Sequence, residues 1–187
     1  MNTTTTTTAL DEPAIWIGCL SCYNNGRLNG KWITAEQAAE PEAAETLNGL
    51  ASVETVGEYT ASRCRKCFGD EFAVMDHQLI PQSCADVKEF YDNAEQLAEL
   101  HNTGQLEIIT LLASNLIMET LGKLLEYHEN NYQGQYSTMN DFAEHLIDEG
   151  VIEIPASLPA HWVDIDAIAR DLAYDHFEIN GHVWRNS

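Results

Sequence analysis

Short apolar runs separated by turn residues characterise the first third of the chain. Four runs are rich in strand formers, and the second of them follows an Asn25-Gly26 turn signal. An Ala- and Glu-rich stretch between them favours a helix, which Pro41 should break. We therefore predict a small α+β module over residues 13–82, preceded by a disordered, threonine-rich tail at residues 1–12. The predicted strands are residues 14–20, 27–33, 53–60 and 72–75, and the predicted helix is residues 35–47.

The hydrophobic period changes after residue 83, where apolar positions begin to recur every three or four residues. This spacing places one apolar face on a helix over residues 86–101, and Ser83 with Asp86 resembles a capping box at its start. Residues 106–127 form a second helical stretch, which is apolar nearly all round at first and should be buried. Together they predict a central helical module over residues 83–128.

The last part of the chain predicts a second α+β module, residues 129–187. A polar, Gly-containing loop over residues 129–138 should lead into a short amphipathic helix. Asn180-Gly181 is a strong hairpin signal between two short apolar segments. We thus predict an elongated α+β chain of three small modules. The elements expected here are helices at residues 141–149 and 164–175 and strands at residues 176–179 and 182–185.

Charge changes this picture more than any single motif. The chain has 187 residues, with 30 acidic and nine basic ones, for a net charge of −21. Residues 1–66 carry a net charge of −3 and residues 67–187 a net charge of −18. Such a chain is repelled by nucleic acid and by anionic membrane surfaces, so basic proteins or cations are its natural partners. High solubility alone is the alternative explanation.

The sequence predicts a cytoplasmic protein. Its threonine-rich start has neither the basic region nor the apolar core of a secretory signal. The longest apolar stretch, residues 106–118, is interrupted by polar residues and is too short to span a bilayer. Cysteines in that compartment stay reduced and available for metal.

Carboxylates recur on the outward faces of the predicted helices. Acids three or four residues apart lie about 4.5–6 Å apart along a helix axis, whereas phosphates on one DNA strand advance about 3.4 Å. Carboxylates on adjacent helices could therefore approach the charge density of a duplex, although an ordinary solvated face explains any single stripe. The candidate DNA-mimic residues are Asp86, Glu89, Asp92, Glu95, Glu99, Glu119, Glu126, Asp141, Glu144, Asp148, Asp164, Asp171 and Asp175.

Two C-x-x-C pairs, Cys19/Cys22 and Cys64/Cys67, match the ligand count and local spacing of a structural zinc site. Buried structural thiols and a redox motif are the alternatives, and the redox reading is disfavoured because no βαβ pattern surrounds either pair. Cys84 stands outside both pairs, and we expect it to be a plain buried residue near a helix start.

Nothing in the sequence favours an enzyme. The seven histidines form no H-E-x-x-H motif, and no nucleophile elbow, phosphate-binding loop or dinucleotide fingerprint is present. Thirty acids make carboxylate pairs inevitable, so such pairs carry no weight as a hydrolase site. We therefore predict a protein that acts without catalysis.

Four segments resemble the ArdA family of antirestriction proteins, which are carried on mobile genetic elements. The first is similar to the family's opening strand, Tyr-Asn-x-Gly turn and Gly-x-Trp strand, and is the most specific. The others resemble an acidic strand, a Tyr-x-Gly-x-Tyr…Asp-Phe-Ala segment, and a C-terminal helix with its hairpin. The matching residues are 14–32, 71–76, 132–143, and 165–172 with 181–184.

The resemblance implies an elongated, curved homodimer that mimics bent DNA and dimerises through the C-terminal module. It also implies inhibition of type I restriction–modification enzymes by occupation of their DNA-binding groove. The paired cysteines are not part of this resemblance, so the zinc prediction rests on their spacing alone. A zinc-stabilised acidic adaptor that binds another basic protein remains the alternative function.

Overall fold

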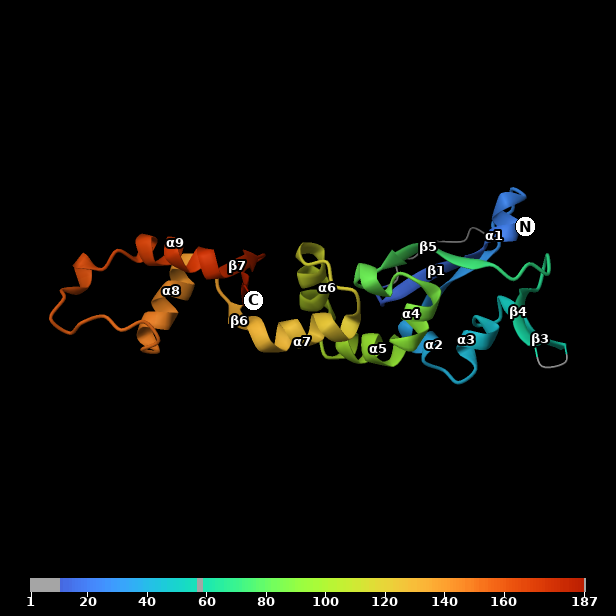
Figure 1. Ribbon diagram of the computed structural model, residues 1–187, viewed down its shortest axis with the longest axis horizontal. Coiled ribbons are helices and arrows are strands. Elements are labelled where there is room, and N and C mark those ends of the chain that lie inside the picture. The colour runs from blue at the N-terminus through green and yellow to red at the C-terminus, as the bar shows by residue number, and fades with distance from the viewer. Residues whose placement is uncertain (1–10, 57–58, 187) are drawn as a thin grey trace. The chain divides into compact units, whose positions relative to one another are not determined.

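The computed structural model describes residues 11–56 and 59–186, apart from the side chains of residues 54–61 and 160 (Figure 1). The predicted disordered tail falls mostly on residues 1–10, outside the described residues. The chain is a mixture of helices and small antiparallel sheets, which confirms the predicted α+β class. By its contacts it divides into two compact units, one reaching to Leu121 and one beginning at Gly122. The three-module division remains a prediction.

The first unit is built on a three-stranded antiparallel sheet in which β1 is central. Its order is β2-β1-β5, with β1 spanning Ala14–Cys19, β2 Gly30–Thr34 and β5 Phe72–Gln78. Five of the six β1 residues are buried, as expected for a central apolar strand. The predicted start of the second strand at residue 27 is wrong, because Arg27 still belongs to the turn after the short helix α1, Leu20–Asn24, where its N–H donates to the Cys22 carbonyl oxygen at 3.0 Å.

Two paired glycines make room for an indole ring on this sheet. Gly18 lies opposite Gly30 in the register of β1 and β2. A Cβ atom at Gly30 would lie 2.4 Å from both the Trp16 ring and the Ile17 carbonyl oxygen, closer than any side chain allows. Because the Ile17 carbonyl oxygen cannot move aside as a flexible side chain can, position 30 requires glycine.

Residues 35–64 form two short helices and a separate hairpin. The predicted helix over residues 35–47 is broken around Pro41, as expected, into α2 (Ala35–Ala38) and α3 (Ala43–Thr46). The predicted single strand at residues 53–60 is wrong, since two strands pair there as an antiparallel two-stranded sheet. These strands are β3, Ala51–Val56, and β4, Tyr59–Cys64.

The predicted helix over residues 86–101 is interrupted at one residue. It forms as α4, Val87–Asp92, and α5, Ala94–Asn102, on either side of Asn93. The Asn93 amide donates to the Glu89 carbonyl oxygen at 2.7 Å, a local bond that competes with regular helical geometry. The cap is Asp86 and not Ser83, because residues 82–84 already form the 3₁₀ turn η1, Gln82–Cys84. The predicted apolar face is buried at Phe90, Ala94 and Leu97.

The predicted helix over residues 106–127 is also two helices. The first, α6, spans Leu106–Asn115, and the second, α7, spans Leu121–Asn131. Leu116 has an extended backbone that ends α6. Ser114 donates its hydroxyl hydrogen to the Leu111 carbonyl oxygen, and such side-chain bonds weaken a helix end. The buried face predicted for this stretch includes Ile109 and Leu112.

The second unit packs α7, α8 and α9 with a small sheet. The strand order is β6-β8-β7, and the predicted C-terminal hairpin of β7 and β8 is confirmed. The predicted loop over residues 129–138 is wrong, because α7 continues to Asn131 and the next four residues pair with β8. Trp184 and Phe142 are the largest fully buried side chains of this unit. The remaining elements are β6 (Tyr132–Gln135), α8 (Met139–Asp148), η2 (Ala160–Trp162), α9 (Ile165–Asp175), β7 (His176–Ile179) and β8 (His182–Arg185).

Candidate functional site

The two C-x-x-C pairs converge, as their spacing predicts. The four Sγ atoms of Cys19, Cys22, Cys64 and Cys67, the cysteine cluster, lie within 4.8 Å of one another. The Sγ atoms of Cys19 and Cys67 are 3.4 Å apart, and those of Cys22 and Cys64 are 3.9 Å apart. Sulfurs bound tetrahedrally to zinc at about 2.3 Å would lie roughly 3.8 Å apart. The cluster could therefore hold a metal ion.

Two chain segments bring these cysteines together. Cys19 ends β1 and Cys22 lies in α1, whereas Cys64 ends β4 and Cys67 lies in the turn that follows. The segments meet at Gly69, where a Cβ atom would lie 2.5 Å from the Ser21 hydroxyl oxygen and 3.4 Å from the Cys67 sulfur. Cys84 is buried and separate from the cluster, as expected, and burial raises the pKa of its thiol to about 11.

The cluster holds one sulfur that favours the thiolate form. Burial alone would raise the pKa of Cys64, but the backbone N–H groups of Lys66 and Cys67 and the neighbouring thiols outweigh it and lower the pKa to about 6. The Asn29 side chain also donates to this sulfur, at 3.1 Å. By contrast, the contact with Cys67 and burial raise the pKa of Cys22 to about 12. Sequence reasoning missed Asn29, because only the folded chain brings it to Cys64.

The thirteen candidate carboxylates lie almost entirely on the surface. Twelve are exposed and Glu89 is half-buried. Nine further acids among residues 67–187 are also exposed, and they lie outside the helical stripes that the sequence pattern predicts. These nine are Asp70, Glu71, Asp76, Glu107, Glu129, Glu149, Glu153, Asp166 and Glu178.

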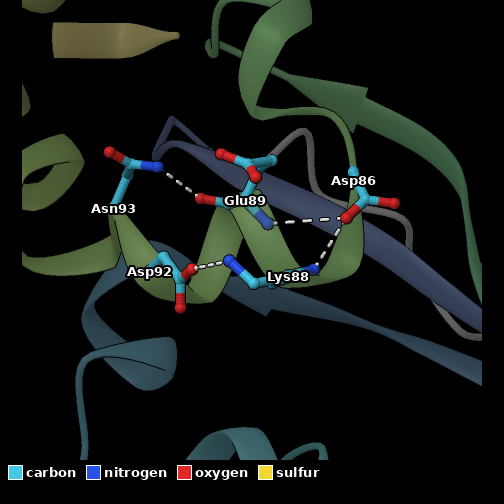
Figure 2. Close-up of polar contacts among 5 residues, drawn as sticks. All are labelled: Asp86, Lys88, Glu89, Asp92 and Asn93. Carbon is cyan, nitrogen blue, oxygen red and sulfur yellow. Dashed lines mark hydrogen bonds and ion pairs between the residues drawn. The ribbon is translucent and has the colours of Figure 1, made fainter.

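Some of these carboxylates also hold local structure. Figure 2 shows that Asp86 caps α4, accepting hydrogen bonds from the backbone N–H groups of Lys88, at 2.9 Å, and Glu89, at 3.5 Å. Asp92 pairs with the Lys88 ammonium one turn away, and this hydrogen bond raises the pKa of Lys88. In the second unit, Asp164 caps α9 by accepting from the Ala167 N–H at 3.0 Å.

The family model for "Antirestriction protein (ArdA)" matches residues 15–183. The chain belongs to the ArdA family. This assignment confirms the resemblance seen in the sequence, and it gives the chain an antirestriction function. A search of curated proteins found no match.

Negative charge is present in both units of this ArdA family member. Residues 1–121 contain 18 acids and six bases, a net charge of −12, and residues 122–187 contain 12 acids and three bases, a net charge of −9. In residues 67–187, 21 of the 22 acids are exposed, and only four bases accompany them. Among the helices that the structure describes, none has the length and apolar content needed to cross a membrane.

The two chain segments that carry the cysteine cluster hold five of the nine bases of the chain. Residues 13–35 and 59–69 contain five bases and no acid, so the rest of the chain carries a net charge of −26. Of these bases, Arg27, Arg65 and Lys66 are exposed. These two segments, the basic region, thus carry the candidate metal site, and the exposed Asp70 and Glu71 follow directly after them.

Proposed function

We propose that this chain inhibits type I restriction–modification enzymes by mimicking DNA. Its carboxylates stand in for phosphates and occupy the DNA-binding groove in the cytoplasm, and no catalytic step is involved. The observation that carries this proposal is the exposure of 21 of the 22 acids in residues 67–187, with only four bases among them. Most solvated helix surfaces mix both signs, whereas a groove that binds DNA selects a nearly unbroken negative field.

The amount of charge also suits a duplex. A homodimer would carry an excess of 42 negative charges, twice the 21 of one chain, which corresponds to roughly 20 base pairs at two phosphates each. Attraction between such a surface and a groove lined with Lys and Arg should weaken steeply with salt, as it does for DNA. No single carboxylate should be essential, because many charges share the field.

A restriction-protection assay tests the function directly. Unmodified phage DNA is introduced into cells that carry a type I enzyme, with and without expression of this chain. The proposal expects higher phage survival with the chain, and no effect in matched cells that lack the enzyme. Equal survival with and without the chain in the restricting cells would contradict it.

A four-for-four comparison tests whether the arrangement of charge matters. One variant carries amides at Asp86, Asp92, Glu95 and Glu99 on α4 and α5, and the control carries amides at Glu36, Glu40, Glu42 and Glu45 in the less acidic first third. All eight side chains are exposed, and both variants lose four charges. The variant changed at α4 and α5 should lose more inhibition than the control variant. Its remaining inhibition should also depend less on salt concentration. Equal losses would mean that only bulk charge matters.

We further propose that the chain dimerises through the C-terminal unit. An apolar groove there is lined by residues of α8, α9 and the segment between them, including Ile147, Leu158 and Ile165. The same unit exposes Val151 and Tyr174, which are 69% and 82% exposed. Leu158→Glu combined with Tyr174→Glu should yield monomers in sedimentation experiments. Ile117→Glu, which changes a fully exposed apolar residue of the first unit, should leave the dimer intact.

We propose zinc as the metal of the cysteine cluster. Four thiolate ligands at near-tetrahedral spacing favour zinc over the hard cations, which prefer oxygen. Metal analysis of purified protein should find about one zinc ion per chain. Replacing Cys64 and Cys67 with Ser should abolish binding, whereas replacing Cys84 should not. Protein purified without any bound metal would refute this assignment.

The zinc site keeps one other function open, a zinc-stabilised acidic adaptor for a different basic protein. Competition separates the two functions. A DNA mimic must be displaced from a purified restriction enzyme by excess duplex DNA, because both need the same groove. An adaptor that binds elsewhere would remain bound at the same DNA concentration.

A further inference from the structure

The β3–β4 hairpin is a separate structural element within the first unit. Its two strands pair with each other and form a sheet distinct from β2-β1-β5. An isolated two-stranded hairpin is at best marginally stable in water. Ser62 donates to the Glu45 carbonyl oxygen at 2.5 Å and the Arg65 N–H donates to the Leu50 carbonyl oxygen at 3.4 Å. These bonds tie the hairpin to the segment just before it, not to the main sheet.

Among the side chains that the structure describes, the cysteine cluster forms a buried contact between the hairpin and the main sheet. Cys19, Cys22 and Cys64 form a small buried core of their own, against which Cys67 and Phe72 pack. The two pairs come from opposite sides of this core, one from the end of β1 and the other from the end of β4. Thiols alone give such a core little apolar area, whereas a metal ion bonded to all four sulfurs would join the two sides directly.

Asn29 supports the view that this core carries negative charge. Its side chain is 8% exposed and donates to the Cys64 sulfur at 3.1 Å, while its carbonyl oxygen accepts from the Cys19 N–H at 2.9 Å. A buried amide donor needs a good acceptor, and a thiolate is a far better one than a neutral thiol. Outer hydrogen bonds of this kind orient the ligands of a metal.

We propose that the metal ion cross-links the β3–β4 hairpin to the main sheet, so that the hairpin and the turn carrying Cys67 are ordered only in the metal-bound protein. This inference rests on the proposed metal site. The rest of the first unit keeps its fold without metal, because its own apolar core includes Ile15, Ile33, Phe90 and Leu97. Metal would thus control one local segment and not the whole molecule.

Limited trypsin digestion of the full-length, zinc-loaded chain tests this cross-link. Arg63, Arg65 and Lys66 lie in or beside the turn between the paired cysteines, and the Arg65 Nε–H donates to the Ala51 carbonyl oxygen at 3.0 Å. After chelation, cleavage at these three sites should be more than tenfold faster, and added Zn²⁺ should restore protection. Cleavage at Lys88 and Arg170, which are exposed but distant in sequence, serves as the internal control and should not change.

Each other outcome contradicts a different step. A chain that binds one zinc ion but shows unchanged cleavage at Arg63, Arg65 and Lys66 would refute the cross-link and leave the metal site standing. Equal acceleration at Lys88 and Arg170 would show that metal holds a larger part of the fold, which also refutes the local cross-link. A chain that binds no metal would refute both proposals.

Cysteine variants provide a second measurement that does not depend on a chelator. Cys64→Ser with Cys67→Ser should be cleaved rapidly at Arg63 even in excess zinc. Cys84→Ser is the matched control, because it removes a buried thiol outside the cluster, and it should keep zinc-dependent protection. Equal protection of both variants in zinc would overturn the proposal.

Discussion

Asp86 allows the structural and electrostatic roles of one carboxylate to be separated. It caps α4 with hydrogen bonds to two backbone N–H groups, and it also belongs to the proposed DNA-mimic surface (Figure 2). Asp86→Asn keeps a capping oxygen and removes the charge, since Asn and Asp cap helices about equally well. Asp86→Ala removes both the cap and the charge.

The expected cost follows from the size of the helix. Loss of a side-chain cap destabilises a protein by about 1 kcal/mol, whereas an Asn cap should keep nearly all of this stability, because Asn and Asp rank about equally as caps. Because α4 has six residues and carries the fully buried Phe90, fraying at its start reaches the core directly. For a chain of this length, that loss should lower Tm by about 2–4 °C. In either variant, the net charge changes only from −21 to −20.

Thermal unfolding and restriction protection should be measured on both variants. Asp86→Ala should melt below the unmodified protein, and Asp86→Asn should melt close to it. Both variants should protect unmodified DNA as well as the unmodified chain does. Equal destabilisation by Asn and Ala would refute the capping argument. Loss of protection in Asp86→Asn would refute the proposal that many carboxylates share one negative field. It would show instead that inhibition needs one specific binding site.

The remaining predictions concern the cysteine cluster and the second unit. Gly69→Ala places a Cβ atom against Ser21 and should weaken zinc retention at least tenfold in a chelator titration, whereas Gly122→Ala in α7, where a Cβ meets no neighbour, should retain zinc normally. Burial, and then the nearby His182, lower the pKa of His128 below its ordinary 6.5. His128 therefore binds a proton more readily in the unfolded chain than in the folded one, so the free energy of unfolding should fall as pH drops through 6.5. His128→Gln should flatten that part of the pH dependence in thermal unfolding; an unchanged slope would assign it to other groups.

Elements and sites are predicted correctly from the sequence where local sequence signals and tertiary packing favour the same structure. Asn180-Gly181 favours a tight hairpin, and the short apolar strands on either side of it pair with each other as that turn requires. The cysteine pairs are similarly informative, because four reduced thiols at this spacing suit one type of site. The short helix α1 has no strong sequence signal, so the start of β2 at Gly30 could not be placed correctly from the sequence.

Tertiary contacts decide the elements that the sequence misplaces. The segment Tyr132–Gln135 is polar and glycine-containing, and it becomes a strand only because β8 offers it an edge. The interruption at Asn93 depends on a side-chain bond within an otherwise regular apolar period. Exposed acids on strands and loops were missed for another reason, since a helical period cannot identify them.

The basic region around the cysteine cluster gives the first unit an electrostatic polarity that duplex DNA does not have. In the proposed complex, a positively charged groove would attract the acidic helices and repel Arg27, Arg65 and Lys66, so its field would rotate the approaching protein toward one orientation. Such steering acts before any contact is made and would raise the association rate more than the final affinity. Phosphates repeat evenly along a duplex, so DNA can enter the groove at any register, whereas this protein would enter it with a preferred direction.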